Sequence, residues 1–195
     1  MEQMPSGLVG HMPSGPGIIS DDLIAAIAAN APAHIATFLL TSETQASAII
    51  THQKRVKTNT VQIVDALQAG TYAEIRQALP GINLVQVIHV TGEESLDEAL
   101  EIAPKVDFIL LDSGNPNLAV KELGGTGRTH NWAISRRIVE SAGIPVFLAG
   151  GLRADNVRAA MEAVQPHGLD LCSSVRTEGK LDPYKLEKFF EAVRT

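Results

Sequence analysis

Short apolar segments alternate with amphipathic helical segments along this chain from residue 7 onward. The run from Phe108 to Leu111 is apolar at every position, which is typical of a strand buried on both faces of a parallel sheet. Strands are predicted over seven such segments, at residues 7–12, 34–40, 60–65, 84–90, 108–113, 145–149 and 168–172. Regular alternation of strand and helix predicts an α/β fold with a parallel sheet, either a barrel or a doubly wound open sheet. Since no G-x-G-x-x-G follows the first strand, a dinucleotide-binding fold is disfavoured.

Several helix starts carry capping signals. Ser20 precedes two acidic residues and a helix whose apolar face is predicted to hold Leu23, Ile24 and Ile27. Capping boxes, in which a Ser or Thr stands three residues before a Glu or Gln, are predicted at Ser42 with Gln45, Thr71 with Glu74 and Ser95 with Glu98. Asp182 before Pro183 predicts the start of the last helix.

The composition bounds the class of protein. At 195 residues, with 45% hydrophobic and 19% charged residues, the chain is predicted to form a single domain over residues 1–195 that can bury a sizeable core. The net charge of −6, without clustered Lys and Arg, argues against a nucleic-acid partner. A single cysteine excludes a disulfide framework and a cysteine-type zinc site, and no ligand cluster indicates a metal or another cofactor. Without an apolar run of about 18 residues or a signal-like opening, we predict no membrane partner and a cytoplasmic location.

One candidate site is visible from the residues alone. Asp112 ends a predicted strand, which is where α/β barrels place their catalytic groups. A glycine loop with a basic neighbour follows, formed by Gly124, Gly125, Thr126, Gly127 and Arg128. Such a loop allows a ligand to approach the backbone closely, although the same glycines would also suit an ordinary turn. An acid at a strand end followed by this loop favours a phosphorylated small molecule as the ligand.

Four motifs, in this order, are specific enough to indicate a family. They read LLDS, GGTGRTHNW, PVFLAGGLRADNV and LDLCSSVRTEGKLD. Together they resemble the phosphoribosylanthranilate isomerase family of tryptophan biosynthesis, strongly from about residue 106 onward. The resemblance implies a TIM (βα)8-type barrel, here with about seven βα units because the first strand and helix are missing. It also implies an Amadori rearrangement of an aminoaldose phosphate to an aminoketose phosphate.

The resemblance assigns roles to individual residues. Asp112 matches the family's general acid, and residues 124–128 match its active-site loop. The phosphate group of a sugar phosphate is expected to lie on the backbone of two loops that follow neighbouring strands, at Gly150, Gly151, Cys172, Ser173 and Ser174. No cofactor and no metal are implied.

Four departures from the family pattern bear on activity. The family opens with a strand close to K-I-C-G, which carries the cysteine general base, whereas only MEQMPS precedes Gly7 here. Gly17 stands where the family has an arginine for the anthranilate carboxylate, the usual Q-L-H-G is QIVD at residues 62–65, and S-S-G-V-E is CSSVR at residues 172–176. Loss of a positioned base typically lowers a rate by about 10²–10⁴-fold. Loss of a charged partner for the carboxylate costs roughly 1.5–3 kcal/mol of binding free energy.

These departures leave rival hypotheses open. The chain is an isomerase of impaired activity, a non-catalytic sugar-phosphate-binding homologue, or an isomerase for a different phosphorylated substrate. A missing first unit would expose strand edges at residues 7–12 and 168–172, which predicts a homo-oligomer or closure by the N-terminal residues. A truncated gene product or a misplaced start site would give the same sequence. Cys172 and His11 would border the gap. Cys172 is interpreted as an inert packing residue and His11 as a satisfied polar residue, and His89 and His130 are assigned no role.

Overall fold

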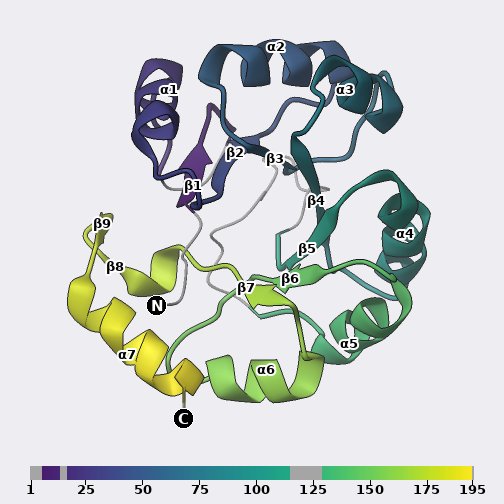
Figure 1. Ribbon diagram of the computed structural model, residues 1–195. Coiled ribbons are helices and arrows are strands. Elements are labelled where there is room, and N and C mark those ends of the chain that lie inside the picture. The colour runs from purple at the N-terminus through teal and green to yellow at the C-terminus, as the bar shows by residue number, and fades with distance from the viewer. Residues whose placement is uncertain (1–5, 14–16, 115–128, 195) are drawn as a thin grey trace. The chain divides into compact units, whose positions relative to one another are not determined.

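A computed structural model describes residues 6–13, 17–114 and 129–194 (Figure 1). These residues form two compact units. The first unit holds residues 6–13, 17–87 and 105–108, and the second holds residues 88–104, 109–114 and 129–194. The single domain predicted over residues 1–195 stays a prediction.

The first unit is built on parallel strands. Its strands are β1 (Ser6–Val9), β2 (Thr37–Thr41), β3 (Thr60–Ile63) and the first part of β4 (Asn83–His89). Successive pairs are parallel, and their register aligns Leu8, Leu39, Val61 and Leu84 in one row. All four side chains are at most 6% exposed, so this row is part of the core.

Helices cover the strands of this unit (Figure 1). They are α1 (Asp21–Asn30), α2 (Ala46–Val56) and α3 (Tyr72–Ala78). Ile24 of α1 and Val56 of α2 are fully buried and form one cluster with Leu8 and Leu39. Burial of a large apolar side chain stabilises the fold by about 1.5–3 kcal/mol, so this contact holds both helices on the strands.

The second unit repeats the strand–helix pattern. Its strands are β5 (Phe108–Asp112), which belongs to this unit from Ile109 onward, β6 (Val146–Leu148) and β7 (Gly168–Leu169), and they pair in parallel, in that order. Its helices are α4 (Glu94–Ile102), α5 (Trp132–Ser141), α6 (Val157–Val164) and α7 (Pro183–Arg194). There are also two 3-10 turns, η1 (Ala103–Lys105), whose last residue belongs to the first unit, and η2 (Ser173–Val175). The remaining described elements are two short antiparallel strands, β8 (Arg176–Thr177) and β9 (Lys180–Leu181).

The predicted strands and three of the predicted caps are confirmed. Each of the seven predicted strand segments contains a strand, although the last is only Gly168–Leu169. Ser20 Oγ accepts a hydrogen bond from Leu23 N at 3.3 Å, and Asp182 accepts from the backbone after Pro183. The capping box of Thr71 and Glu74 has both of its reciprocal bonds.

Two other predicted capping boxes are wrong, and so is one predicted position on the apolar face of α1. Helix α2 begins after Gln45 with no side-chain cap, because Ser42 Oγ instead donates to the carbonyl of His11 at 3.0 Å. Ser95 lies inside α4, where its hydroxyl donates to the carbonyl of His89 at 3.3 Å. Leu23 is 48% exposed, so the buried face of α1 is narrower than predicted.

The capping box at the start of α3 provides a test of the local structure. Thr71→Ala removes the acceptor for Glu74 N, at 3.2 Å, and is expected to lower the free energy of unfolding by about 1 kcal/mol. Thr51→Ala is the matched control, because Thr51 is an exposed residue within α2 whose hydroxyl donates only to the carbonyl of Ser47. Alanine favours a helix interior, so the control should be neutral or slightly stabilising. Urea unfolding monitored by circular dichroism gives both values, and equal losses would contradict the prediction.

Among the described residues, no helix has both the length and the apolar character needed to cross a bilayer.

Candidate active site

A row of residues lies at the carboxyl ends of the strands of the second unit. The register aligns Leu111 of β5, Leu148 of β6 and Leu169 of β7. The hydrogen bonds continue one residue further, since Ala149 N donates to Leu111 O at 2.7 Å and Asp170 N donates to Leu148 O at 2.9 Å. The next residues in line are therefore Asp112, Ala149 and Asp170. Residues opposite one another in parallel strands face the same side of the sheet, so the two carboxylates flank a small methyl group.

His89 extends this row from the end of β4. Val90 N donates to the carbonyl of Asp112 at 2.9 Å, which places His89 beside Asp112. Both side chains are buried, with 7% of His89 and 6% of Asp112 exposed. The site thus brings an imidazole and two carboxyl groups to the carboxyl ends of neighbouring parallel strands, where barrel enzymes hold their catalytic groups.

The protonation of Asp112 is shifted by its surroundings. Burial raises the pKa of Asp112 above its usual value, because the charged carboxylate loses water. Backbone hydrogen bonds from Ser113 and Gly114 and the charge of His89 oppose this shift and lower the pKa. A carboxyl group with a raised pKa retains its proton to higher pH and is suited to general acid catalysis.

Asp170 is shifted in the same direction. Its pKa is raised to about 6, first because the surrounding protein removes water from the carboxylate and second because of the charge on Asp112. Its side chain nevertheless has a solvent-exposed surface, unlike that of Asp112. Like-charged neighbours resist simultaneous ionisation, so the two carboxyl groups titrate as an interacting pair.

A glycine turn follows β6. Gly150 and Gly151 have φ values of 83° and 62°, in the left-handed region that favours glycine. A Cβ atom on Gly150 would lie 2.9 Å from the backbone nitrogen of Ser113, so only glycine permits this close approach. The side chain of Asn156 fixes the turn, since its Nδ2 donates to Gly151 O at 3.0 Å and its Oδ1 accepts from Arg153 N at 2.8 Å.

The segment after β7 forms the 3-10 turn η2, which begins after Cys172. Cys172 is partly buried and Ser173 is exposed. The hydroxyl oxygen of Ser174 is buried and has no hydrogen-bond partner among the described residues. Because β6 and β7 are paired, this turn and the glycine turn follow neighbouring strands, which is the arrangement predicted for the phosphate site.

The structure brings most of the predicted site residues together. Gly150 lies close to the backbone of Ser113, the residue after Asp112. Residues 172–174 come after β7, which pairs with β6, and β6 in turn pairs with β5, which ends at Asp112. Gly124, Gly125, Thr126, Gly127 and Arg128 lie outside the described residues. Among the described residues, no group of three His, Cys, Asp or Glu side chains is placed to hold a metal ion.

Two members of the row, His89 and Asp170, were not predicted from the sequence. Neither was assigned a role. His89 lies next to the end of the predicted strand at residues 84–90, the kind of position that singled out Asp112. Asp170 lies in the middle of the predicted segment 168–172, and only the observed end of β7 at Leu169 places it beyond the strand.

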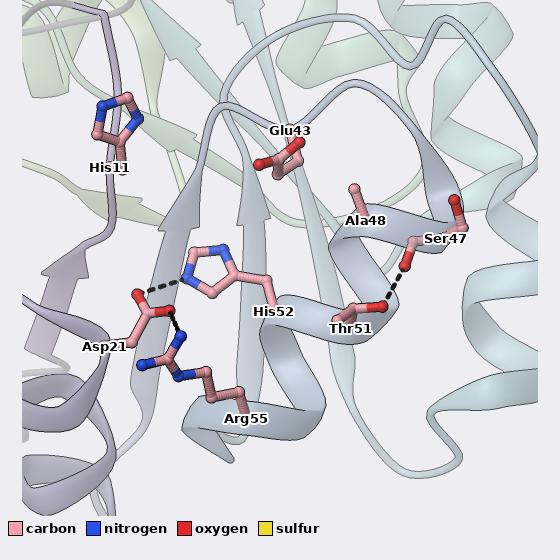
Figure 2. A pocket seen from close by; sticks show the side chains of 8 residues that line it. All are labelled: His11, Asp21, Glu43, Ser47, Ala48, Thr51, His52 and Arg55. Carbon is pink, nitrogen blue, oxygen red and sulfur yellow. Dashed lines mark hydrogen bonds and ion pairs between the residues drawn. The ribbon is translucent and has the colours of Figure 1, made fainter.

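A pocket of about 430 Å³ in the first unit is a rival candidate (Figure 2). It lies beside α1 and α2 and is lined by His11, Asp21, Glu43, Ser47, Ala48, Thr51, His52 and Arg55. Its central charges are already paired with one another, since Asp21 Oδ1 lies 3.1 Å from His52 Nε2 and Asp21 Oδ2 lies 3.4 Å from Arg55.

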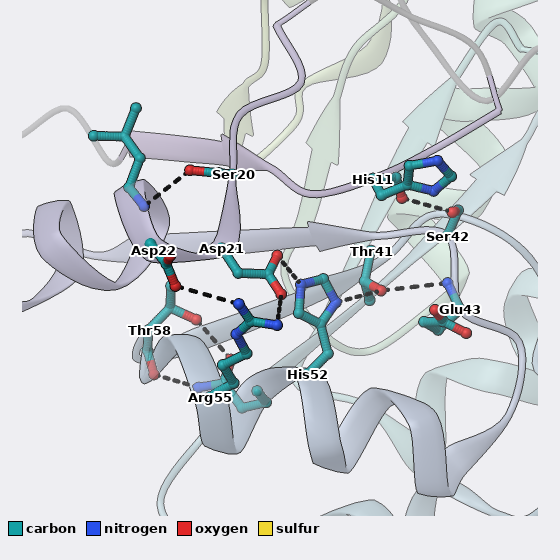
Figure 3. Close-up of polar contacts among 12 residues, drawn as sticks. His11, Ser20, Asp21, Asp22, Thr41, Ser42, Glu43, His52, Arg55 and Thr58 are labelled. Atoms are coloured by element: carbon teal, nitrogen blue, oxygen red, sulfur yellow. Dashed lines mark hydrogen bonds and ion pairs between the residues drawn. The ribbon is translucent and has the colours of Figure 1, made fainter.

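The same pairs connect three elements of the first unit (Figure 3). His52 Nδ1 lies 3.2 Å from the hydroxyl of the buried Thr41, so the imidazole links α1 and α2 to β2. Arg55 also pairs with Asp22 at 3.2 Å. These contacts indicate a structural connection between the helices and the strand, and they favour the strand-end row as the reactive site.

His130 makes the stability of the protein sensitive to acid. Burial lowers its pKa to about 4, and its Nε2 lies 2.7 Å from the hydroxyl of Ser135. An unfolded chain has a histidine pKa of about 6.5, so between these values the unfolded state binds the proton more tightly. The contribution of His130 to stability is therefore present above about pH 6.5 and is lost as the pH falls toward 4.

We expect the urea midpoint of the unaltered protein to decrease between pH 7.5 and pH 4.5. In His130→Gln the decrease over the same pH range should be smaller. Glutamine keeps hydrogen-bonding capacity near Ser135 but does not titrate. Equal decreases in the two proteins would contradict this assignment.

Comparison with known proteins identifies the family. The family model for N-(5'phosphoribosyl)anthranilate (PRA) isomerase matches residues 15–192. The N-(5'-phosphoribosyl)anthranilate isomerase of Methanosarcina acetivorans is 34% identical over 203 aligned residues, which cover 96% of this chain and 83% of the relative.

Solved structures agree on the fold. The phosphoribosylanthranilate isomerase of Thermococcus kodakaraensis has a TM-score of 0.76 at 24% identity, over 97% of this chain and 87% of the other. A further isomerase of this kind, solved in complex with reduced 1-(O-carboxyphenylamino)-1-deoxyribulose 5-phosphate, has a TM-score of 0.73 at 22% identity, over 96% and 86% of the two chains. The predicted TIM (βα)8-type α/β fold, with about seven βα units, is confirmed. The predicted family is confirmed as well: this chain belongs to the N-(5'-phosphoribosyl)anthranilate isomerase family.

Proposed function

We propose that this chain catalyses the Amadori rearrangement for which its family is named, converting N-(5'-phosphoribosyl)anthranilate, an aminoaldose phosphate, to an aminoketose phosphate in tryptophan biosynthesis. The observation that carries the proposal is the buried Asp112, with its raised pKa, next to the glycine turn at Gly150. An acid that retains its proton beside a backbone anion site is what the opening of a phosphorylated sugar ring requires.

Asp112 is the general acid of this proposal. It gives its proton to the ring oxygen as the bond between that oxygen and C1 breaks, and the nitrogen lone pair forms the C1–N double bond. Burial favours this step, because the environment that raises the pKa of the group also excludes water that would compete for the proton.

The phosphate is proposed to lie between the two turns that follow β6 and β7. Backbone N–H groups of Gly150, Gly151, Cys172 and Ser173 and the buried hydroxyl of Ser174 would hold its oxygens. The role of residues 124–128 as an active-site loop stays a prediction. The ligand is thus a sugar phosphate, and no cofactor or metal takes part in the proposal. Cytoplasmic location and association of two chains through strand edges stay predictions.

A different aminoaldose phosphate is the second candidate substrate. Gly17, which is exposed with a φ of 88°, stands where the family has its arginine. A glycine offers no positive charge to a carboxylate, so a substrate without the anthranilate carboxylate would lose nothing here.

Complementation of a tryptophan auxotroph tests the proposal, together with an assay of the purified chain on phosphoribosylanthranilate. Growth that Asp112→Ala abolishes would establish the activity. Failure to grow, with inorganic phosphate still raising the melting temperature, would favour a non-catalytic sugar-phosphate-binding protein. Growth that survives Asp112→Ala would overturn the assignment of the acid.

A further inference from the structure

Asp112 and Asp170 are placed to act on one ligand from two sides. Asp112 ends β5 and Asp170 follows β7. Both strands pair with β6, and the residue between the two in the row is Ala149. Neighbouring strands lie about 4.8 Å apart, so the two Cα atoms are roughly 10 Å apart. Ala149, which lies between them, carries only a methyl group and is itself buried.

The two carboxyl groups differ in their access to water. Asp112 is 6% exposed, whereas the side chain of Asp170 reaches solvent. Burial raises the pKa of both groups, because each carboxylate loses hydration on ionising. His89 faces Asp112 from β4 and lowers its pKa, but burial has the larger effect. The charge that acts on Asp170 is that of Asp112.

The raised pKa of Asp112 favours its protonated form, and Asp170 is the more accessible of the two carboxyl groups. The pKa of Asp170, raised to about 6, gives a carboxylate that is mostly charged at pH 7 and more basic than an ordinary aspartate. The two groups therefore offer an acid and a base on the same face of the sheet.

We propose that Asp170 is the general base that removes the C2 proton of the substrate, acting with Asp112 across Ala149. The inference rests on the proposed function and adds a catalytic residue to it. It assigns the second proton transfer to a side chain of the second unit, within the same row as the acid.

The protons and electrons balance in this scheme. Asp112 gives one proton to the ring oxygen, and C1 becomes doubly bonded to a positively charged nitrogen. Asp170 takes the proton from C2, and the electrons of that C–H bond form a C1–C2 double bond while the nitrogen regains its lone pair. The resulting enaminol gains a proton at C1 and loses one from its C2 hydroxyl to give the ketone. The proton on Asp170 returns to Asp112 through solvent, which restores the enzyme.

The test compares Asp170→Asn, Asp170→Ala and the unaltered full chain on phosphoribosylanthranilate between pH 5 and pH 8. In the unaltered chain, kcat/KM is expected to fall as the pH drops below about 6, because protonation removes the base. Asp170→Asn is expected to lower kcat by about 10²–10⁴-fold with little change in KM, and to abolish this acid limb. Added formate is expected to restore part of the activity of Asp170→Ala, since a small carboxylate can enter the vacated, solvent-accessible position.

A matched control removes the same charge elsewhere in the unit. Asp97 is exposed on α4, and Asp97→Asn should retain full activity and the acid limb.

If Asp170→Asn does not fold, Asp170→Glu is measured instead, and a displaced acid limb is then expected. An unchanged profile in Asp170→Glu would overturn the inference, as would Asp170→Asn activity within about threefold of the unaltered chain. If the unaltered chain does not isomerise the substrate, the proposed function is overturned together with this inference. If the unaltered chain and Asp170→Asn are similarly active, only the inference is overturned.

Discussion

Asp112→Asn is expected to lower kcat for phosphoribosylanthranilate isomerisation by about 10²–10⁴-fold, the typical contribution of a positioned general acid. Asparagine keeps the size of the side chain and can still receive the backbone hydrogen bonds from Ser113 and Gly114. What it lacks is the proton for the ring oxygen. The change should therefore appear in kcat, measured by steady-state kinetics, while the KM stays close to that of the unaltered chain.

The stability of this variant separates chemistry from folding. A carboxyl group whose folded pKa lies above its unfolded value weakens the fold at pH values above both, because its ionised form is poorly solvated. Asparagine removes that penalty, so the urea midpoint at pH 7.5 should be unchanged or higher. Asp155→Asn is the control, since Asp155 is exposed and pairs only with Arg153 at 3.1 Å. Full activity in Asp112→Asn would remove this residue from the mechanism.

Gly150→Ala is expected to be the most damaging small substitution in the second unit. A non-glycine residue at a φ of 83° costs roughly 1–2 kcal/mol. The added methyl would also lie 2.9 Å from Ser113 N, and such crowding against backbone costs typically about 1–3 kcal/mol more. The total loss of about 2–5 kcal/mol should be accompanied by loss of phosphate-dependent stabilisation, because the turn must move.

Gly143→Ala isolates the backbone part of this effect. Gly143 has a similar φ of 69°, but a Cβ there meets nothing within 4 Å. It should cost only about 1–2 kcal/mol and leave phosphate binding intact. Thermal unfolding with and without inorganic phosphate measures both quantities. If the two variants lose the same stability, the close approach of Gly150 to Ser113 does not contribute to the cost of the substitution.

The strands were predictable because their signal is local. An apolar run such as residues 108–111 must be buried wherever it occurs, and each predicted segment contains a strand. The two failed capping boxes show where local reasoning ends. Ser42 and Ser95 have the right spacing, but each hydroxyl donates to a backbone carbonyl that the fold brings near it, of His11 and His89 respectively. A partner distant in sequence replaced the local one.

The site was predictable only in part. Asp112 and the two backbone turns follow from motifs that are contiguous in the sequence. The row of His89, Asp112 and Asp170 depends on strand register, and one residue of slip would turn each side chain to the other face of the sheet. Register is set by packing between strands, which a single sequence does not display.

The proposed phosphate contacts have a consequence for how this protein can change over generations. Main-chain amides at residues 172 and 173 are supplied by almost any amino acid, whereas the turn at residue 150 tolerates no Cβ. In a library of random variants selected for retained phosphate binding, diversity should accumulate at position 173 and vanish at position 150. The anion would thus be recognised by the conformation of the backbone, and the sequence would reflect that recognition mainly through the glycine at position 150.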